Sequence, residues 1–234
     1  MSSPRAPRPA PRALVVAIDG PAASGKSSTA NEVARRLGFL HVDSGALYRA
    51  LTLVALDLGQ DATAEQILRA AELRDVRLRI EGTRLWVLLE GGDAEPRIRS
   101  PEVTALVSPV SAMSAIRDWV NRRLRDLAAN GASLVLDGRD IGTAVFPDAA
   151  IKVYLDASPE TRARRRLEQR GQRTDAETLA AEAARIAARD AADSSRAIAP
   201  LRAADDAVHL DTGSLTFEQQ VDRIVGLVRE ALLA

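Results

Sequence analysis

The segment from Gly20 to Ser27 reads GPAASGKS and has the spacing of a phosphate-binding loop. Glycines let the backbone curl until successive N–H groups point at one anion, and a following helix adds partial positive charge at its N-terminus. In loops of this spacing the lysine, here Lys26, contacts the outer phosphates of a nucleoside triphosphate, and the hydroxyl of Ser27 can bind Mg²⁺. The segment therefore predicts a triphosphate site, although it does not name the reaction.

Further charged residues follow two apolar segments. DGRD at 137–140 follows the apolar residues 133–136, and Asp43 follows the apolar residues 39–42. Arg49 comes about one helical turn after Gly45, where its guanidinium could hold a second phosphate, unless it is an ordinary surface arginine. Asp137 could orient the water shell of Mg²⁺ or could simply cap a loop. These strand ends therefore indicate a charged ligand.

Arginines are dense between residues 162 and 173, around a break at Gly171. Such a run usually forms a solvated helix face. After a phosphate loop, a mobile lid is the better interpretation, because arginines stabilise the charge on a moving phosphoryl group and closure excludes water. Arg189, Asp193 and Arg196 share one face of the next helix, where they either bind the ligand or form a salt-bridge ladder.

Short apolar segments alternate with helical patterns through most of the chain. We expect strands at residues 14–18, 39–42, 133–137, 150–155 and 207–211, and helices after residues 27, 45, 113, 158, 174 and 216. Thr174 and Thr216 each begin a segment with the spacing of a capping box. This alternation predicts a doubly wound, five-stranded parallel sheet with helices on both faces. Ligands of such sheets bind at the carboxyl ends of the strands, where the acids stand.

The middle of the chain differs from the rest. Val76, Leu78 and Ile80 alternate with arginines, and Glu81–Gly82 separates them from the apolar residues 85–89. Because this is the pattern of a β-hairpin, we expect a small antiparallel unit inserted between the α/β elements.

The bulk composition narrows the class of protein. The 234 residues carry 32 basic and 32 acidic side chains and no cysteine, so neither nucleic-acid binding by a global field nor thiolate metal sites are expected. No apolar run reaches the ~18 residues of a membrane span, and the lack of cysteine suits the cytoplasm. Residues 1–13 are interpreted as a disordered tail, and both His41 and His209 as structural residues of strands.

Five segments, in this order and spacing, resemble the bacterial cytidylate kinases, which are P-loop kinases of nucleoside monophosphates: IDGPAASGKS, DSGALYRAL, DGRDIGTAVFP, KVYLDAS and RDAADSSRAIAPL. The likeness runs from about residue 14 to the C-terminus, and the third and fifth segments are the most specific. It implies ATP-dependent phosphorylation of CMP and dCMP by a monomer that uses Mg²⁺. The alternatives are a kinase of UMP or AMP and a nucleotide-dependent switch without kinase activity.

The resemblance also implies roles for individual residues. Donor binding falls to Gly20, Pro21, Ala22, Ala23, Ser24, Gly25, Lys26, Ser27 and Ser28. Substrate binding falls to Ser44, to Arg49, Arg139 and Arg196 on the acceptor phosphate, to Asp193 on the sugar, and to Ser108, Arg117 and Asp140 on cytosine. Catalysis by charge neutralisation falls to Lys26, Arg139, Arg162, Arg166 and Arg196. Mg²⁺ would be served by Ser27 and, through water, by Asp137.

The same resemblance divides the chain into parts. It implies a core of residues 14–60, 101–160 and 174–234, an enlarged monophosphate-binding insert at about 61–100 and a lid at about 161–173. Ser27 departs from the family pattern, since many relatives have glycine there, and Ala22 stands where some have serine. Base chemistry supports the cytosine assignment independently: a carboxylate such as Asp140 accepts from the N4 amino group, whereas uracil would present a carbonyl to it.

Overall fold

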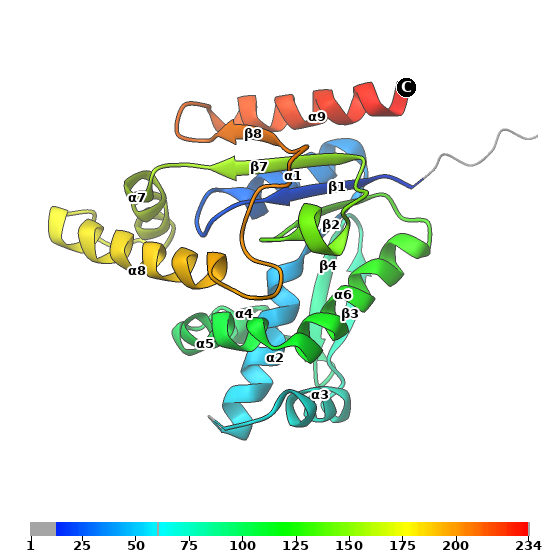
Figure 1. Ribbon diagram of the computed structural model, residues 1–234, viewed down its shortest axis with the longest axis vertical. Helices are drawn as coiled ribbons and strands as arrows, with labels where there is room; N and C mark the ends of the chain where they lie inside the picture. The colour runs from blue at the N-terminus through cyan, green and yellow to red at the C-terminus, as the bar shows by residue number, and fades with distance from the viewer. Residues whose placement is uncertain (1–12, 60, 234) are drawn as a thin grey trace, which may run out of the picture.

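The fold, in a computed structural model that describes residues 13–59 and 61–233, is centred on one mixed β-sheet (Figure 1). Five consecutive strands of this sheet, ending with the edge strand β8, are in spatial order β2 (Leu40–Asp43), β6 (Leu134–Asp137), β1 (Val15–Asp19), β7 (Ile151–Asp156) and β8 (Val208–Asp211). Neighbouring strands in this set pair in parallel, so the predicted five-stranded parallel sheet is confirmed. The tail predicted for residues 1–13 lies outside the described residues, except for Ala13.

Side chains along the strands alternate between two apolar layers, as a period of two requires. Val16 and Ile18 of β1 join one layer, which includes side chains of α1 (Lys26–Leu37) and α9 (Phe217–Leu233). Ala17, between them, joins the other layer with α2 (Ser44–Leu58) and α6 (Ser114–Ala129). Helices therefore cover both faces of the sheet, as a doubly wound fold predicts.

The hairpin predicted in the middle of the chain is present as β3 (Arg77–Glu81) and β4 (Arg84–Leu89), which are antiparallel. β4 also pairs with the short β5 (Gly92–Asp93) and, in parallel, with β2 through His41 and Arg84. The hairpin therefore continues the central sheet at one edge. Local turn signals do not reveal that link, because they report the hairpin and not its neighbour.

Three helices lie in regions where the sequence predicts none: α3 (Ala64–Leu73), α4 (Glu95–Ile98) and α5 (Pro101–Ala112). The first has a capping box at Thr63. α5 begins after the cap Ser100 and contains Pro109, a residue that normally argues against a helix interior. α5 packs on α2, which explains how tertiary contacts override this local signal.

The remaining elements are η1 (Ile141–Val145), a π-helical turn, and the adjacent helices α7 (Pro159–Gln169) and α8 (Ala176–Ser194), which lie beyond the end of β7 (Figure 1). Thr216 and Gln219 form the predicted capping box. The box predicted at Thr174 is wrong by one residue, because Asp175 accepts from the Thr178 N–H at 3.0 Å and caps α8 instead. Among the described helices, none combines the length and the apolar character that crossing a membrane requires.

Candidate active site

The phosphate loop connects β1 to α1, as the sequence predicts. Gly20 cannot be replaced without a shift of the backbone, because a Cβ there would lie 2.0 Å from the Leu155 carbonyl oxygen. Lys26 turns back onto the loop, where its Nζ donates to the Pro21 carbonyl at 2.5 Å. Burial, and then repulsion from Arg139, hold the pKa of Lys26 well below its ordinary value. Within the described residues, the hydrogen bonds of the Lys26 amine go to the Pro21 carbonyl and the Ser24 hydroxyl and to no carboxylate, so the loop leaves this amine for an anionic ligand.

Asp137 stands at the end of β6, beside the loop. Its Oδ2 accepts from the Ser27 hydroxyl at 2.5 Å, and its Oδ1 is 2.8 Å from His41 Nε2. Burial opposes ionisation of Asp137, yet His41, Ser27 and Lys26 together hold its pKa below the usual value. A hydroxyl and a carboxylate side by side form the hard-oxygen donor set that Mg²⁺ prefers, so these residues fit the metal of a bound nucleotide.

Asp193 of α8 gathers the polar groups on the other side of the cavity. One carboxylate oxygen accepts from Arg139 Nε at 2.9 Å, and the other accepts from the Ser108 hydroxyl at 3.0 Å and from Arg196. Arg139 also donates to the Gly20 carbonyl at 3.1 Å, so it reaches the phosphate loop as well. Asp193 thus orients two arginines that lie between the loop and α8.

Arg117 and Asp140 form a buried ion pair that lines the same cavity. Only 2% of Arg117 and 4% of Asp140 are exposed. The guanidinium lies 5.5 Å from the centre of the Tyr48 ring and donates to the Ser111 carbonyl at 3.1 Å. Burial raises the pKa of Asp140, although Arg117 opposes this shift. The pair places a hydrogen-bond donor, Arg117, next to an acceptor, Asp140, at a position that is buried from solvent.

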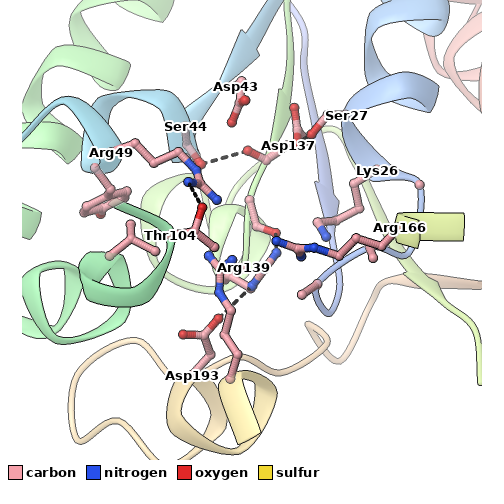
Figure 2. A pocket seen from close by; sticks show the side chains of 18 of the residues that line it. Lys26, Ser27, Asp43, Ser44, Arg49, Thr104, Asp137, Arg139, Arg166 and Asp193 are labelled. Atoms are coloured by element: carbon pink, nitrogen blue, oxygen red, sulfur yellow. Dashed lines mark hydrogen bonds and ion pairs between the residues drawn. The ribbon is translucent and has the colours of Figure 1, made fainter. Parts of the chain in front are cut away.

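These groups line a single cavity of about 980 Å³ that carries an excess of positive charge. Figure 2 shows Lys26, Arg139 and Arg166 converging on it from three elements. Arg49 extends from α2 and is held by the Thr104 hydroxyl at 2.9 Å. Burial and repulsion between cations lower the pKa of Arg49 to about 10 and that of Arg189 to about 9. Bound phosphates would relieve this repulsion, so the cavity fits a polyanionic ligand.

A family model for cytidylate kinase matches residues 16–230. The chain belongs to the cytidylate kinase family. The cytidylate kinase of Geobacillus kaustophilus (strain HTA426) is 46% identical over 226 residues, covering 94% of this chain and 99% of the relative. That of Mycolicibacterium paratuberculosis (strain ATCC BAA-968 / K-10) is 45% identical over 222 residues, covering 93% and 96%. The crystal structure of TT1252 from Thermus thermophilus shares the fold, with a TM-score of 0.50 and 18% identity over 94% of this chain and 97% of that one.

Most residues that the family resemblance singles out come together in the cavity. Those that line it are Ala22, Ala23, Gly25, Lys26, Ser27, Ser28, Ser44, Arg49, Arg117, Asp137, Arg139, Asp140, Arg166, Asp193 and Arg196. Three residues of the phosphate loop do not line the cavity: Gly20, Pro21 and Ser24. Ser108 does not line it either, but its hydroxyl donates to Asp193, which does. Ser44 donates to the Asp137 carbonyl at 2.7 Å, so it also braces the end of β6.

Arg162 does not line the cavity either. Its guanidinium is buried and donates to the Ala157 and Ala22 carbonyls and to Asp190. All these partners belong to the protein, so in this structure Arg162 links α7 to the phosphate loop and to α8, and its role in neutralising charge on the substrate stays a prediction.

Several cavity residues escape the sequence prediction. The sequence puts Arg189 on the same helix face as Asp193 and gives it no individual role. It lines the cavity, and its Nε has no hydrogen-bond partner among the described residues. Phe217, in the first turn of α9, also lines the cavity although it is 46% exposed. His41 does not line the cavity, but its ring contacts Asp137 of the neighbouring strand β6. The available signal for Phe217 is an aromatic residue directly after Thr216, the first residue of the predicted capping box.

Proposed function

We propose that this protein transfers the γ-phosphoryl group of ATP to the phosphate of CMP and of dCMP. Its membership of the cytidylate kinase family supports the reaction. The single observation that carries the acceptor assignment is the buried Arg117–Asp140 pair, because it shares one cavity with the phosphate loop. A nucleotide that spans the cavity would place its base at the Arg117–Asp140 pair and its phosphate among the arginines.

Cytosine complements this pair. Its N4 amino group donates a hydrogen bond, which the Asp140 carboxylate accepts, while N3 and O2 accept hydrogen bonds from Arg117. Uracil presents a carbonyl in place of the amino group and would leave Asp140 facing another acceptor in a buried site. Such an unsatisfied contact is costly, so CMP is preferred over UMP.

The transfer itself requires no strong general base, because the acceptor phosphate oxygen is ionised near neutral pH. That oxygen attacks the γ-phosphorus, a P–O bond forms, and the bond from the γ-phosphorus to the bridging oxygen of ADP breaks. Lys26, Arg139 and Arg166 face the cavity and neutralise the charge that spreads over the moving group. Ser27 and, through water, Asp137 would hold Mg²⁺, which would supply further neutralisation of this charge.

We propose roles for the other cavity residues in holding the remaining parts of the substrates. Arg49, Arg139 and Arg196 hold the acceptor phosphate, and Asp193 holds the sugar. Phe217 provides an apolar face for the donor base near the end of the phosphate loop. Residues 61–100 act as the monophosphate-binding region and 161–173 as the lid. The cytoplasmic location stays a prediction from the lack of cysteine, and the monomeric state stays one from the family resemblance.

A coupled spectrophotometric assay with ATP and each monophosphate in turn tests the function. ADP formation should depend on CMP or dCMP, with UMP a weaker acceptor and AMP inactive. Preference for AMP would overturn the base assignment. ATP hydrolysis that no monophosphate stimulates would instead favour a nucleotide-dependent switch.

A further inference from the structure

Ala22 lies in the middle of the phosphate loop. Its N–H and its carbonyl group are both bound by one ion pair of protein side chains, Arg162 and Asp190. The Ala22 N–H donates to Asp190 Oδ1 at 2.9 Å. Its carbonyl accepts from Arg162 Nη1 at 3.0 Å, and the same nitrogen donates to Asp190 Oδ2 at 2.5 Å. Asp190 and Arg162 therefore form one unit with the loop backbone.

The Ala22 side chain also contacts the two helices α7 and α8. Its methyl group packs with Ala163 of α7 and Ile186 of α8, and all three residues are nearly inaccessible to solvent. A serine at this position would place a hydroxyl in that apolar contact. The loop thus docks on α7 and α8 through one residue, by apolar packing on one side and by the Arg162–Asp190 pair on the other.

The helix that carries Asp190 also carries the acceptor side of the cavity. Asp193 lies three residues further along α8, on the same face, and binds Arg139 and Arg196. One carboxylate of this face therefore contacts the donor loop, and the other contacts the arginines assigned to the acceptor. The separation between them is about one turn of helix, roughly 5 Å.

We infer that Arg162 and Asp190 are positioning residues that fix the distance between the donor loop and the acceptor-binding face of α8. The inference rests on the proposed phosphoryl transfer, which needs the attacking oxygen and the γ-phosphorus within a narrow range of separation and angle. When the pair is broken, both substrates still bind, but they are aligned less well. Water then competes better with CMP for the phosphoryl group.

The test measures two rates on each variant: formation of CDP, and release of inorganic phosphate from ATP in the presence of saturating CMP. Asp190→Ala removes both contacts, whereas Asp190→Asn keeps an acceptor for the Ala22 N–H. Misalignment of about 1 Å can cost on the order of 10²-fold in rate, so Asp190→Ala should lower kcat by up to this factor. The fraction of ATP lost to water should rise, with the KM for CMP little changed, and Asp190→Asn should lie between wild type and Asp190→Ala.

Arg162→Lys provides a second route to the same unit if Asp190→Ala does not fold. The double variant Asp190→Asn/Arg162→Lys should be no worse than the poorer single variant, because both residues act through one contact. Glu160→Ala is the matched control, since it removes an exposed ion pair with Arg164 on the same helix α7 and should leave the two rates unchanged.

A lower melting temperature with an unchanged fraction of ATP lost to water would show a purely structural pair and overturn the inference. Additive losses in the double variant would also overturn it. Failure of the proposed function gives a different result, because the wild-type protein itself would then form no CDP.

Discussion

Positive charges have different partners in two regions of the cavity. One is the phosphate loop (Gly20–Ser27), proposed to bind the donor, and the other is the acceptor cluster of Arg117, Arg139, Asp140 and Asp193. In the loop, Lys26 rests on a backbone carbonyl and the remaining contacts come from a curled main chain, with Ala23 and Gly25 at positive φ of 60° and 91°. In the acceptor cluster, arginines rest on carboxylates: Arg117 on Asp140, and Arg139 on Asp193.

This difference indicates where specificity lies. A curled backbone with one lysine recognises phosphate by shape and charge, and it places few demands on the rest of the ligand. A cluster of Arg–Asp pairs admits a ligand only when that ligand replaces the partners of both charges, since a buried unpaired charge is costly. We therefore expect the donor half to control turnover and the acceptor half to control the choice of substrate.

The largest effect should come from Lys26→Ala, which tests the donor half. Loss of the only loop cation should reduce kcat by about 10³-fold, because charge on the transferred group loses a preorganised partner. CMP affinity, measured by calorimetry, should stay near that of the wild type. Near-normal turnover would show that the loop is not the donor site.

Asp140→Asn tests the acceptor half and should reverse the pattern. The KM for CMP should rise roughly 10- to 100-fold, because a charged acceptor is lost from a buried site, while the KM for ATP is unchanged. Asp206→Asn is the control, since Asp206 is exposed and binds Lys152 at the surface. Equal losses for ATP and CMP would refute a base-reading role.

His41→Phe tests the proposed Mg²⁺ site at Ser27 and Asp137, which lies between the donor and acceptor regions. Without its partner, the Asp137 carboxylate is less well oriented toward Ser27, so ATP binding should need about tenfold more Mg²⁺. Calorimetric titrations of ATP at several Mg²⁺ concentrations measure this directly. His209→Phe, on the exposed face of β8, should behave like the wild type; an unchanged Mg²⁺ requirement in His41→Phe would exclude the role.

The smallest effect is expected for Phe217→Ala. Loss of one partly exposed stacking surface should raise the KM for ATP by about fivefold, the equivalent of ~1 kcal/mol. Leu232→Ala removes another exposed apolar side chain of α9 and should have no effect. A change in the KM for CMP instead would place Phe217 on the acceptor side.

The sequence predicts the parts of the site that depend on local order. The phosphate loop is recognisable because its strand, its glycines and its helix are consecutive, and the cap at Ser158 depends only on residues three apart. The contact of His41 with Asp137 joins residues 96 apart in the chain. It becomes visible only when the strand order, which local patterns do not specify, places β2 beside β6.

Arg162 illustrates a second limit. A spacing of four residues places three arginines on one helix face: Arg162, Arg166 and Arg170. From the sequence alone, all three are therefore equally expected to contact the substrate. Arg166 and Arg170 line the cavity, whereas Arg162 is drawn to Asp190 by the packing of α7 against α8. The direction of a helix face relative to a neighbouring helix is a tertiary property, and sequence spacing cannot supply it.

The unusual environment of Lys26 has a chemical consequence. The sequence contains two lysines, and the other, Lys152, binds Asp206 as an ordinary cation. Burial and repulsion from Arg139 lower the pKa of Lys26, and phosphate oxygens beside the amine oppose both causes by favouring its charged form. A bound triphosphate should therefore raise the pKa of Lys26, so that the donor nucleotide and the proton on this amine stabilise each other. Donor affinity should then fall at alkaline pH, and an ATP affinity that does not change with pH would contradict this coupling.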